Sequence, residues 1–225
     1  DLLPGGYLGV DIFYVISGYL ITHLILDNIK NHTLCFFDFY ERRARRLLPA
    51  LFVVILFSIL AGYIFMLPAQ LKNLSGSAIS SLIFLSNFWF FFTDNYFGDS
   101  SNFKPLLHTW SLSIEEQFYL VFPPALYFLL HKKIKISFFC ILLIICSLIF
   151  SQLGSTYFKD FNFYNLISRI WELAFGSLIA YYHVENKINK NLYSNRFLMI
   201  IAVIFILIPL SSNQQPGLGE KAFIL

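Results

Sequence analysis

Long apolar stretches recur along this chain, and they leave few ways in which it can fold. A helix needs roughly 17–25 mostly apolar residues to cross a bilayer, and six stretches reach or approach that length. They are residues 7–26, 47–67, 109–130, 134–150, 166–182 and 197–210. Charged residues make up only 13% of the 225 residues, about half the share of an average soluble protein. The sequence therefore predicts an all-α fold, a polytopic transmembrane helix bundle rather than a water-soluble domain.

A seventh apolar stretch, residues 78–92, has only 15 residues, a length more typical of a re-entrant or interfacial helix. Lysine and arginine favour cytoplasmic loops, so their distribution can decide whether this stretch crosses. With Arg169 left aside because it lies inside a span, the other 15 divide 11 to 4 without a crossing and 8 to 7 with one. We therefore expect about six spanning helices plus one short re-entrant or interfacial helix, with a full crossing as the alternative. The expected cytoplasmic segments are residues 27–46, 131–135 and 183–196, and the outer segments are residues 68–108 and 151–165.

Five ionisable residues interrupt the apolar stretches. They are Asp11, Glu115, Glu116, Arg169 and Glu172. Each costs ~2.5–3.5 kcal/mol near the centre of a spanning helix, so such residues usually face the bundle interior or a wet cavity. A structural interpretation remains open for three of them. Asp11 could cap its helix or reach the interface, and Arg169 and Glu172, three residues apart on one helix face, could neutralise each other.

Glu115 and Glu116 are adjacent, and no basic residue lies within one helical turn of them in the sequence. Adjacent helical residues point about 100° apart, so we expect the two carboxylates to face different partners. His108, Ser111 and Glu115 fall on one stripe of the helix, and Tyr119 extends it. A carboxyl group held in an apolar environment on such a stripe is suited to proton transfer. A helix cap or an interfacial position is the alternative for His108.

Four arginines stand in five positions just before the second long apolar stretch. They are Arg42, Arg43, Arg45 and Arg46. Arginines beside a membrane commonly set the topology and contact anionic lipid headgroups. Guanidinium groups also bind phosphate through paired hydrogen bonds. The cluster therefore predicts either a lipid anchor or a site for a phosphate-rich cytoplasmic ligand.

Other kinds of site have weaker support in the sequence. Ser17 and Ser111 are candidate nucleophiles, although serines in helices usually bond to the backbone or pack against neighbours. The five histidines are scattered without the spacing of metal ligands, so we expect no metal site. They are His23, His32, His108, His131 and His183. The net charge of +3 gives no indication of nucleic-acid binding.

Four segments of the chain together resemble the acyltransferase-3 family of bacterial integral-membrane O-acyltransferases, which modify surface glycans. The segments are GVDIFYVISGYLIT at 9–22, FYERRARRLLPA at 39–50, PLLHTWSLSIEEQFY at 105–119 and RIWELAFG at 169–176. They occur in the order and spacing of the family and cover most of the chain. The third segment is the most specific of the four.

The resemblance implies transfer of an acyl group, usually acetyl, from cytoplasmic acyl-CoA to a sugar hydroxyl at the outer face of the bacterial inner membrane. The implied acceptor is a surface glycan such as lipopolysaccharide O-antigen, and the implied partners are this glycan and the lipid bilayer. The resemblance places Glu116, Glu115 and His108 in the family's motif and favours Glu116 as essential with Glu115 supporting, although the helical stripe favours Glu115. With Ser111 of that stripe, these are the expected catalytic residues. The family's Arg-x-x-Arg motif implies that Arg42, Arg43, Arg45 and Arg46 bind CoA. The expected cavity residues are Asp11, Ser17, Trp110, Tyr119, Arg169 and Glu172.

The chain departs from the family pattern in two places. Tyr14 stands where a second phenylalanine is common. The family's first helix, with its conserved arginine and histidine, has no counterpart here. We therefore expect residues 1–225 to be part of one transmembrane acyltransferase domain that lacks its first and C-terminal helices and does not catalyse alone. The wording of the first two segments also resembles members that carry a C-terminal extracytoplasmic esterase-like domain.

A transporter or flippase for a glycan or lipid-linked precursor is the alternative function, because it too would bury charged residues along a pathway. Such proteins often contain short or broken spans at matching places in two halves. We find no such pairing in the sequence, so the acyltransferase interpretation is preferred.

Overall fold

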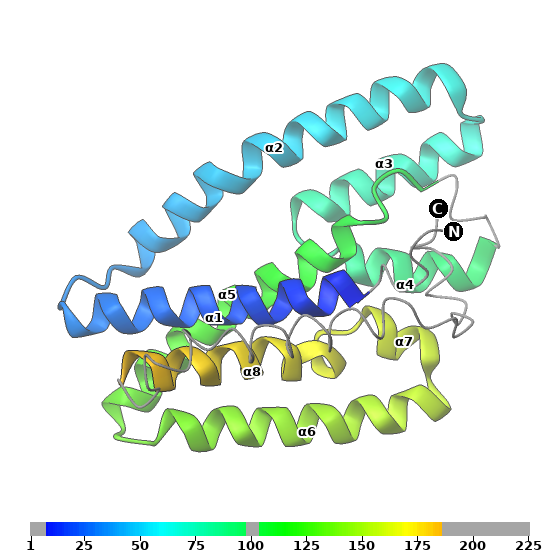
Figure 1. The fold of residues 1–225 in the computed structure, drawn as a ribbon. Helices are drawn as coiled ribbons and strands as arrows, with labels where there is room; N and C mark the ends of the chain where they lie inside the picture. The colour runs from blue at the N-terminus through cyan, green and yellow to red at the C-terminus, as the bar shows by residue number, and fades with distance from the viewer. Residues whose placement is uncertain (1–7, 98–103, 186–225) are drawn as a thin grey trace, which may run out of the picture.

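The computed structural model describes residues 8–97 and 104–185, and these residues are helical apart from short connections and contain no β-strand. Eight helices follow one another in the described ranges (Figure 1). They are α1 (Leu8–Lys30), α2 (Phe36–Phe65), α3 (Pro68–Leu82), α4 (Ser86–Phe97), α5 (Thr109–His131), α6 (Ile136–Tyr157), α7 (Lys159–Tyr164) and α8 (Leu166–Val184). The all-α fold predicted from the apolar stretches is therefore confirmed.

Within the described ranges, three helices are long and apolar enough to cross a membrane by themselves: α1 from Gly9, α2 and α6. Helices α5 and α8 coincide with the predicted spans 109–130 and 166–182, but each carries more buried polar residues than α1, α2 or α6. The predicted span 197–210 lies outside the described residues. Much of α2 and α6 is exposed, and their exposed side chains are mostly large and apolar, as a lipid-facing surface requires.

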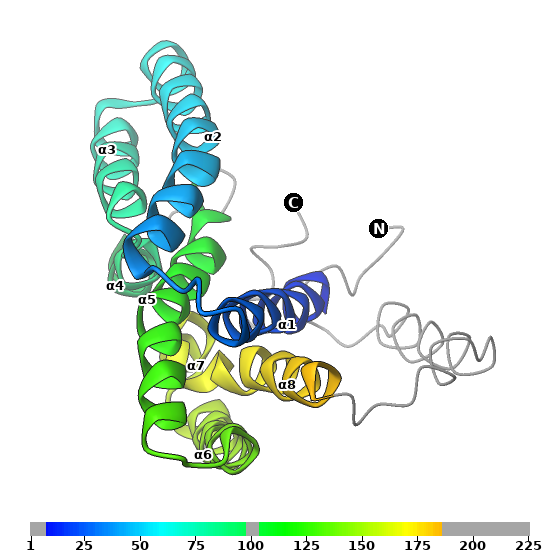
Figure 2. The ribbon, with the colours of Figure 1, turned by 90° about the vertical axis from the view of Figure 1, so that its left-hand side faces the viewer.

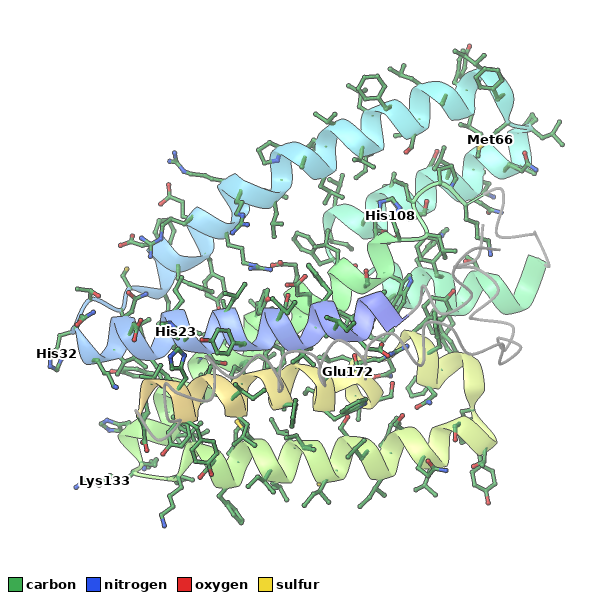
Figure 3. The ribbon with its side chains drawn as sticks, viewed as in Figure 1. His23, His32, Met66, His108, Lys133 and Glu172 are labelled. Carbon is green, nitrogen blue, oxygen red and sulfur yellow. The ribbon has the colours of Figure 1, made fainter. Side chains whose placement is uncertain are left out.

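The connections between the long helices gather at two opposite ends of the bundle (Figure 1). The loops that contain His32 and Lys133 lie at one end, together with the end of α8, and Met66 lies at the other (Figure 3). We call the first of these the basic end, because Lys30, Lys132 and Lys135 also belong to it. Its segments are those predicted to share the cytoplasmic side, as far as they are described.

Helix α1 packs along α8, and α6 lies against the other side of α8 (Figure 2). Small residues allow the close approach of α1 and α8. A Cβ atom on Gly18 would collide with the Leu173 carbonyl, and one on Gly176 would collide with the Val15 carbonyl. The Ser177 hydroxyl lies 2.9 Å from the Leu173 carbonyl of its own helix and 3.3 Å from the Gly18 carbonyl of α1, and it can donate to either. Small residues are the usual means of bringing two helices into close contact within a membrane.

The apolar stretch 78–92 does not form the single short helix that we predicted. It is divided between α3 and α4, which form a hairpin whose second arm returns toward the end where the first began (Figure 1). Phe84 adopts a left-handed conformation with φ 55°, and the amides of Phe84 and Leu85 bond to the carbonyls of Ser81 and Ser80. This is the Schellman pattern that ends a helix. The sequence did not reveal it because the left-handed position usually holds glycine.

Polar side chains of α5 bind the tip of this hairpin. Ser86 contacts Ser113 through both its amide and its hydroxyl, and Gln117 donates to the Phe84 carbonyl at 2.9 Å and to Asn87 at 2.9 Å. Irregular backbone at membrane depth is tolerated where it is buried in protein and its polar groups are satisfied. Helix α5 therefore anchors the hairpin while its other faces meet α1, α2 and α8.

Candidate functional site

Arg43 of α2 reaches across to the two adjacent glutamates of α5. Its Nε and Nη2 atoms lie 2.6 Å and 2.5 Å from Oε1 of Glu116, and Nη2 lies 3.5 Å from Oε1 of Glu115. The guanidinium also stacks on the Tyr119 ring, with 3.6 Å between Cζ and the ring centroid. One cation from a distant part of the sequence thus meets a buried carboxylate, a partly buried carboxylate and an aromatic face.

Two hydroxyl groups donate to Glu115. The Tyr119 hydroxyl lies 2.5 Å from its Oε1 atom, and the Ser17 hydroxyl of α1 donates to the same oxygen. Only 4% of Glu115 is exposed, so these contacts replace the water that an ionised carboxylate would otherwise bind. We call the set of Ser17, Arg43, Glu115, Glu116 and Tyr119 the inner cluster.

The geometry corrects one expectation. The 100° between adjacent helical residues led us to expect that Glu115 and Glu116 could not face one partner, but both lie within ion-pair distance of Arg43. A guanidinium is broad and carries several donors at the end of a long side chain, so it can bridge two carboxylates that leave the helix in different directions. The two glutamates still differ, because hydroxyl groups bond to Glu115 and the shortest contact of Arg43 is with Glu116.

The four arginines of α2 do not act as one group. Arg42, Arg45 and Arg46 are exposed, whereas Arg43 turns inward. Arg45 pairs with Glu41 one turn earlier, at 2.6 Å, and its side chain is 79% exposed. Three of the four arginines therefore lie at the surface of α2 within one turn of Arg43, and one of these three, Arg45, is paired with Glu41.

A second group of charges joins α1 to α8. Arg169 Nη1 lies 2.6 Å from Asp11 Oδ1 and 3.1 Å from Glu172 Oε1. The Cζ atom of this arginine also lies 5.8 Å from the ring centroid of Trp110 and 5.5 Å from that of Phe163. We call these five residues the outer cluster. The pair of Arg169 and Glu172 foreseen from their spacing is therefore part of a larger set.

Glu172, labelled in Figure 3, is the most buried of the three charged members of the outer cluster. It is 1% exposed, and its Oε2 atom has no hydrogen-bond partner among the described residues. A buried carboxylate oxygen without a donor is costly. The ion pair with Arg169 is therefore the main contact that the described residues offer to this carboxylate.

One face of α1 connects the two clusters. Asp11, Tyr14 and Ser17 stand at intervals of three residues, so they share this face and span about 9 Å along the helix axis. Tyr14 is fully buried and donates to the Ser111 carbonyl at 3.2 Å. A line of buried polar groups thus runs from the outer cluster to the inner cluster.

Side-chain hydrogen bonds connect only part of the stripe of His108, Ser111, Glu115 and Tyr119 that we predicted on α5. Tyr119 bonds to Glu115 as described above, but the Ser111 hydroxyl donates to the backbone carbonyl of His108 at 3.0 Å. His108 stands at the start of α5, where its side chain makes no capping hydrogen bond and the residue is exposed (Figure 3). The catalytic roles of His108 and Ser111 therefore stay predictions.

Sequence reasoning missed the polar face of α5 that holds the hairpin. Thr109, Ser113 and Gln117 recur every four residues along α5, which is the signal that could have revealed a common face. Thr109 contacts Ser81 at 2.8 Å and Ser86 at 3.0 Å. This face positions the hairpin and does not contact the inner cluster through any of these bonds.

Comparison with known proteins gives a consistent set of relatives. Residues 3–223 match the protein family described as "Acyltransferase domain". The peptidoglycan O-acetyltransferase OatA of Listeria monocytogenes is 48% identical over 124 residues, 54% of this chain and 20% of that protein. The O-acetyltransferase OatA of Staphylococcus aureus is 40% identical over 131 residues, 58% of this chain and 22% of that protein. An uncharacterized protein of Haemophilus influenzae is 35% identical over 210 residues, 88% of this chain and 84% of that protein.

The chain spans about a fifth of the length of the two O-acetyltransferases that it matches. No solved structure matches the chain.

Proposed function

Because this chain belongs to the acyltransferase domain family, we propose that it is the membrane part of an O-acetyltransferase. The proposed reaction moves an acetyl group from cytoplasmic acetyl-CoA to a hydroxyl of an extracytoplasmic glycan. The relatives named as O-acetyltransferases support the choice of acetyl as the acyl group. The basic end of the bundle faces the cytoplasm in this proposal, in agreement with the preference of lysine and arginine for that side.

The observation that carries the proposal is the line of buried polar groups between the two clusters. Charged residues inside a membrane protein usually mark a pathway or a reaction site. Helix α2 begins at the basic end, and Arg43 lies about 10 Å along it. Helix α1 begins at the opposite end, and Asp11 lies in its first turn. A donor that enters at one end and an acceptor that enters at the other can therefore approach the same buried groups.

The exposed arginines are suited to hold the donor. Arg42, Arg45 and Arg46 lie at the surface of α2, next to Arg43 in the sequence. CoA carries several phosphates, and guanidinium groups bind phosphate with charge-assisted hydrogen bonds. We assign the phosphates to these three arginines and place the thioester beside the inner cluster.

The hydrogen bonds favour Glu115 over Glu116 as the group that moves a proton. Glu115 accepts bonds from hydroxyl groups, which is the geometry that a general base needs. Glu116 is held in a close ion pair with Arg43, which suits a role in positioning that cation. The sequence led us to expect the opposite assignment, and activity measurements on both variants distinguish the two.

We propose a glycan of the cell envelope as the acceptor. The name of the Listeria relative specifies peptidoglycan, and this makes peptidoglycan our first candidate. Lipopolysaccharide O-antigen, the acceptor expected from the sequence, is the competing candidate. Both are polyhydroxyl sugars, so the assay has to include both.

The experiment supplies radiolabelled acetyl-CoA to inside-out membrane vesicles that contain the intact protein carrying this chain. We expect label in glycan that mild alkali releases as acetate, and no such label in vesicles from cells without the gene. Purified peptidoglycan and lipopolysaccharide fractions identify the acceptor. An absence of labelled glycan, with glycan carried across the membrane instead, would favour the transporter or flippase.

A labelling experiment tests the orientation. Single cysteines replace Lys133 at the basic end and Tyr157 at the other end, both of which are exposed, in a protein without its native cysteines. An impermeant thiol reagent added to whole cells should modify the cysteine at 157 and spare the one at 133. The reverse pattern contradicts the proposed direction of transfer.

A further inference from the structure

Ser17 differs from the other serines in the described ranges in what its hydroxyl contacts. Ser75, Ser111 and Ser177, for example, donate to backbone carbonyls of their own helices, which is the usual behaviour of serine in a helix. Ser17 donates instead to the carboxylate of Glu115 on another helix, and no other described serine donates to a carboxylate. The residue is 5% exposed, so this bond lies in the protein interior.

The surroundings of this hydroxyl contain the groups that acyl transfer requires. Activation of a serine requires a base within hydrogen-bond reach, itself held by a third group. Glu115 is that base, and the Tyr119 hydroxyl holds the same carboxylate oxygen at 2.5 Å. The Arg43 guanidinium lies 3.5 Å from this oxygen, where it can stabilise negative charge that develops on an acyl oxygen. Three helices thus bring a hydroxyl, a base and a cation to one point.

We propose that Ser17 is a catalytic nucleophile that carries the acyl group between the donor and the acceptor. This inference rests on the proposed function and adds a covalent intermediate to it. The Ser17 oxygen attacks the thioester carbonyl, its proton passes to Glu115, and the tetrahedral oxyanion is stabilised by Arg43. The carbon–sulfur bond then breaks, and the CoA thiolate takes the proton back from Glu115 and leaves as the thiol, so Glu115 is again a carboxylate when the acceptor arrives.

The second step regenerates the enzyme. An acceptor hydroxyl attacks the Ser17 ester and gives its proton to Glu115. The bond between the acyl carbon and the Ser17 oxygen breaks, and this oxygen recovers a proton from Glu115. The net change is the loss of one thioester and the gain of one acetate ester on the acceptor, with no oxidant or reductant.

A structural role for Ser17, as a bond that joins α1 to α5, makes a different prediction. Tyr14 already bonds α1 to α5 through the Ser111 carbonyl, so the loss of the Ser17 bond alone would leave that contact and reduce stability slightly. A nucleophile can be recognised by a reaction that needs no acceptor. An acyl-enzyme forms reversibly, so the protein should exchange its acetyl group between acetyl-CoA and labelled CoA.

The experiment measures this exchange with the intact protein in detergent, without glycan. We expect exchange by the wild-type protein and a loss of at least ~100-fold in Ser17→Ala, the scale expected for a positioned catalytic group. Ser17→Cys should retain exchange and accumulate an acetyl thioester on residue 17, which mass spectrometry locates and hydroxylamine removes. Ser177→Ala is the matched control, because Ser177 is also buried but bonds to backbone carbonyls, and it should exchange normally.

The outcomes separate the inference from the proposed function. If the wild-type protein labels glycan but shows no exchange without it, or if Ser17→Ala exchanges normally, direct transfer holds and the Ser17 inference is overturned. If the wild-type protein neither labels glycan nor exchanges acetyl groups between acetyl-CoA and CoA, both the proposed function and the Ser17 inference are overturned. Should Ser17→Ala fail to fold, an acetyl group located on residue 17 of a folded Ser17→Cys protein still supports the inference, and its absence overturns it.

Discussion

The inner and outer clusters contain the same combination of charges in different surroundings. In each, one arginine lies between two carboxylates: Arg43 between Glu115 and Glu116, and Arg169 between Asp11 and Glu172. The partners around the charges differ. Hydroxyl groups from two helices reach one inner carboxylate, that of Glu115, whereas the rings of Trp110 and Phe163 lie near the outer arginine.

This difference indicates which cluster is suited to chemistry. Hydroxyl groups next to a carboxylate can exchange protons with it, and the inner cluster adjoins the exposed arginines of α2. The outer cluster joins α1 to α8, the same two helices that Gly18 and Gly176 bring into close contact. We therefore expect the outer cluster to support the fold and the inner cluster to support the reaction.

The largest expected effect is on stability, from Arg169→Leu. This change leaves Asp11 and Glu172 without their shared cation, and breaking a buried ion pair costs about 3–5 kcal/mol. Thermal unfolding in detergent should show a large decrease in Tm. Arg43→Leu should lower Tm less, because Glu115 keeps the hydroxyl groups of Ser17 and Tyr119. A larger loss in Arg43→Leu would contradict the division of roles.

Replacing all three charged residues of the outer cluster with neutral ones tests whether unpaired charge causes the loss of stability. The combination of Asp11→Asn, Arg169→Met and Glu172→Gln removes all three charges at once, so no charge remains buried without a partner. We expect most of the lost stability to return, as happens when buried ion pairs are replaced by neutral side chains. Failure to recover would mean that the charges have a role beyond mutual neutralisation.

The next effect concerns the donor. Arg42→Ala combined with Arg46→Ala should weaken acetyl-CoA binding by at least about tenfold, since each charge-assisted hydrogen bond to phosphate is worth ~1.5–3 kcal/mol. Both arginines are exposed, so Tm should not change. Isothermal titration with acetyl-CoA measures the affinity. Unchanged affinity in a folded protein would leave lipid anchoring as the role of these residues.

A smaller effect should follow from Tyr119→Phe. The ring that supports Arg43 remains, but Glu115 loses one of its two hydroxyl donors, so we expect acetyl transfer to slow a few-fold to about tenfold. Tyr40→Phe is a matched control, because the Tyr40 hydroxyl bonds to the backbone carbonyl of Leu120 at 3.0 Å and not to a carboxylate. Equal rates in the two variants would show that the Tyr119 hydroxyl does not assist Glu115.

The fold followed from the sequence where one physical effect was dominant. Long apolar stretches gave α1, α2 and α6, because lipid requires apolar helices with internal hydrogen bonds. The distribution of lysine and arginine predicted which loops share one end of the bundle, and the described loops lie at the ends so predicted. The hairpin was only half foreseen, because its break depends on Phe84 in a left-handed conformation and on bonds from Ser113 and Gln117. No local rule assigns that conformation to phenylalanine.

The site was foreseen residue by residue but not as an arrangement. Burial costs identified Asp11, Glu115, Glu116, Arg169 and Glu172 as residues with special roles. The sequence could not reveal that Arg43 leaves its neighbours and pairs with residues more than 70 positions away. This contact depends on how α2 crosses α5, which no spacing along the chain encodes.

The most direct test compares Glu115→Gln with Glu172→Gln in the intact protein. The same substitution removes one buried carboxylate from each cluster while it keeps the size of the side chain. Acetyl transfer from labelled acetyl-CoA to glycan is measured per folded molecule. We predict a loss of ~10²–10⁴-fold in Glu115→Gln, the scale of general acid–base catalysis, and turnover of wild-type order in Glu172→Gln. Near-normal transfer in Glu115→Gln, or an equal loss in both variants, would contradict the assignment of the reaction to the inner cluster.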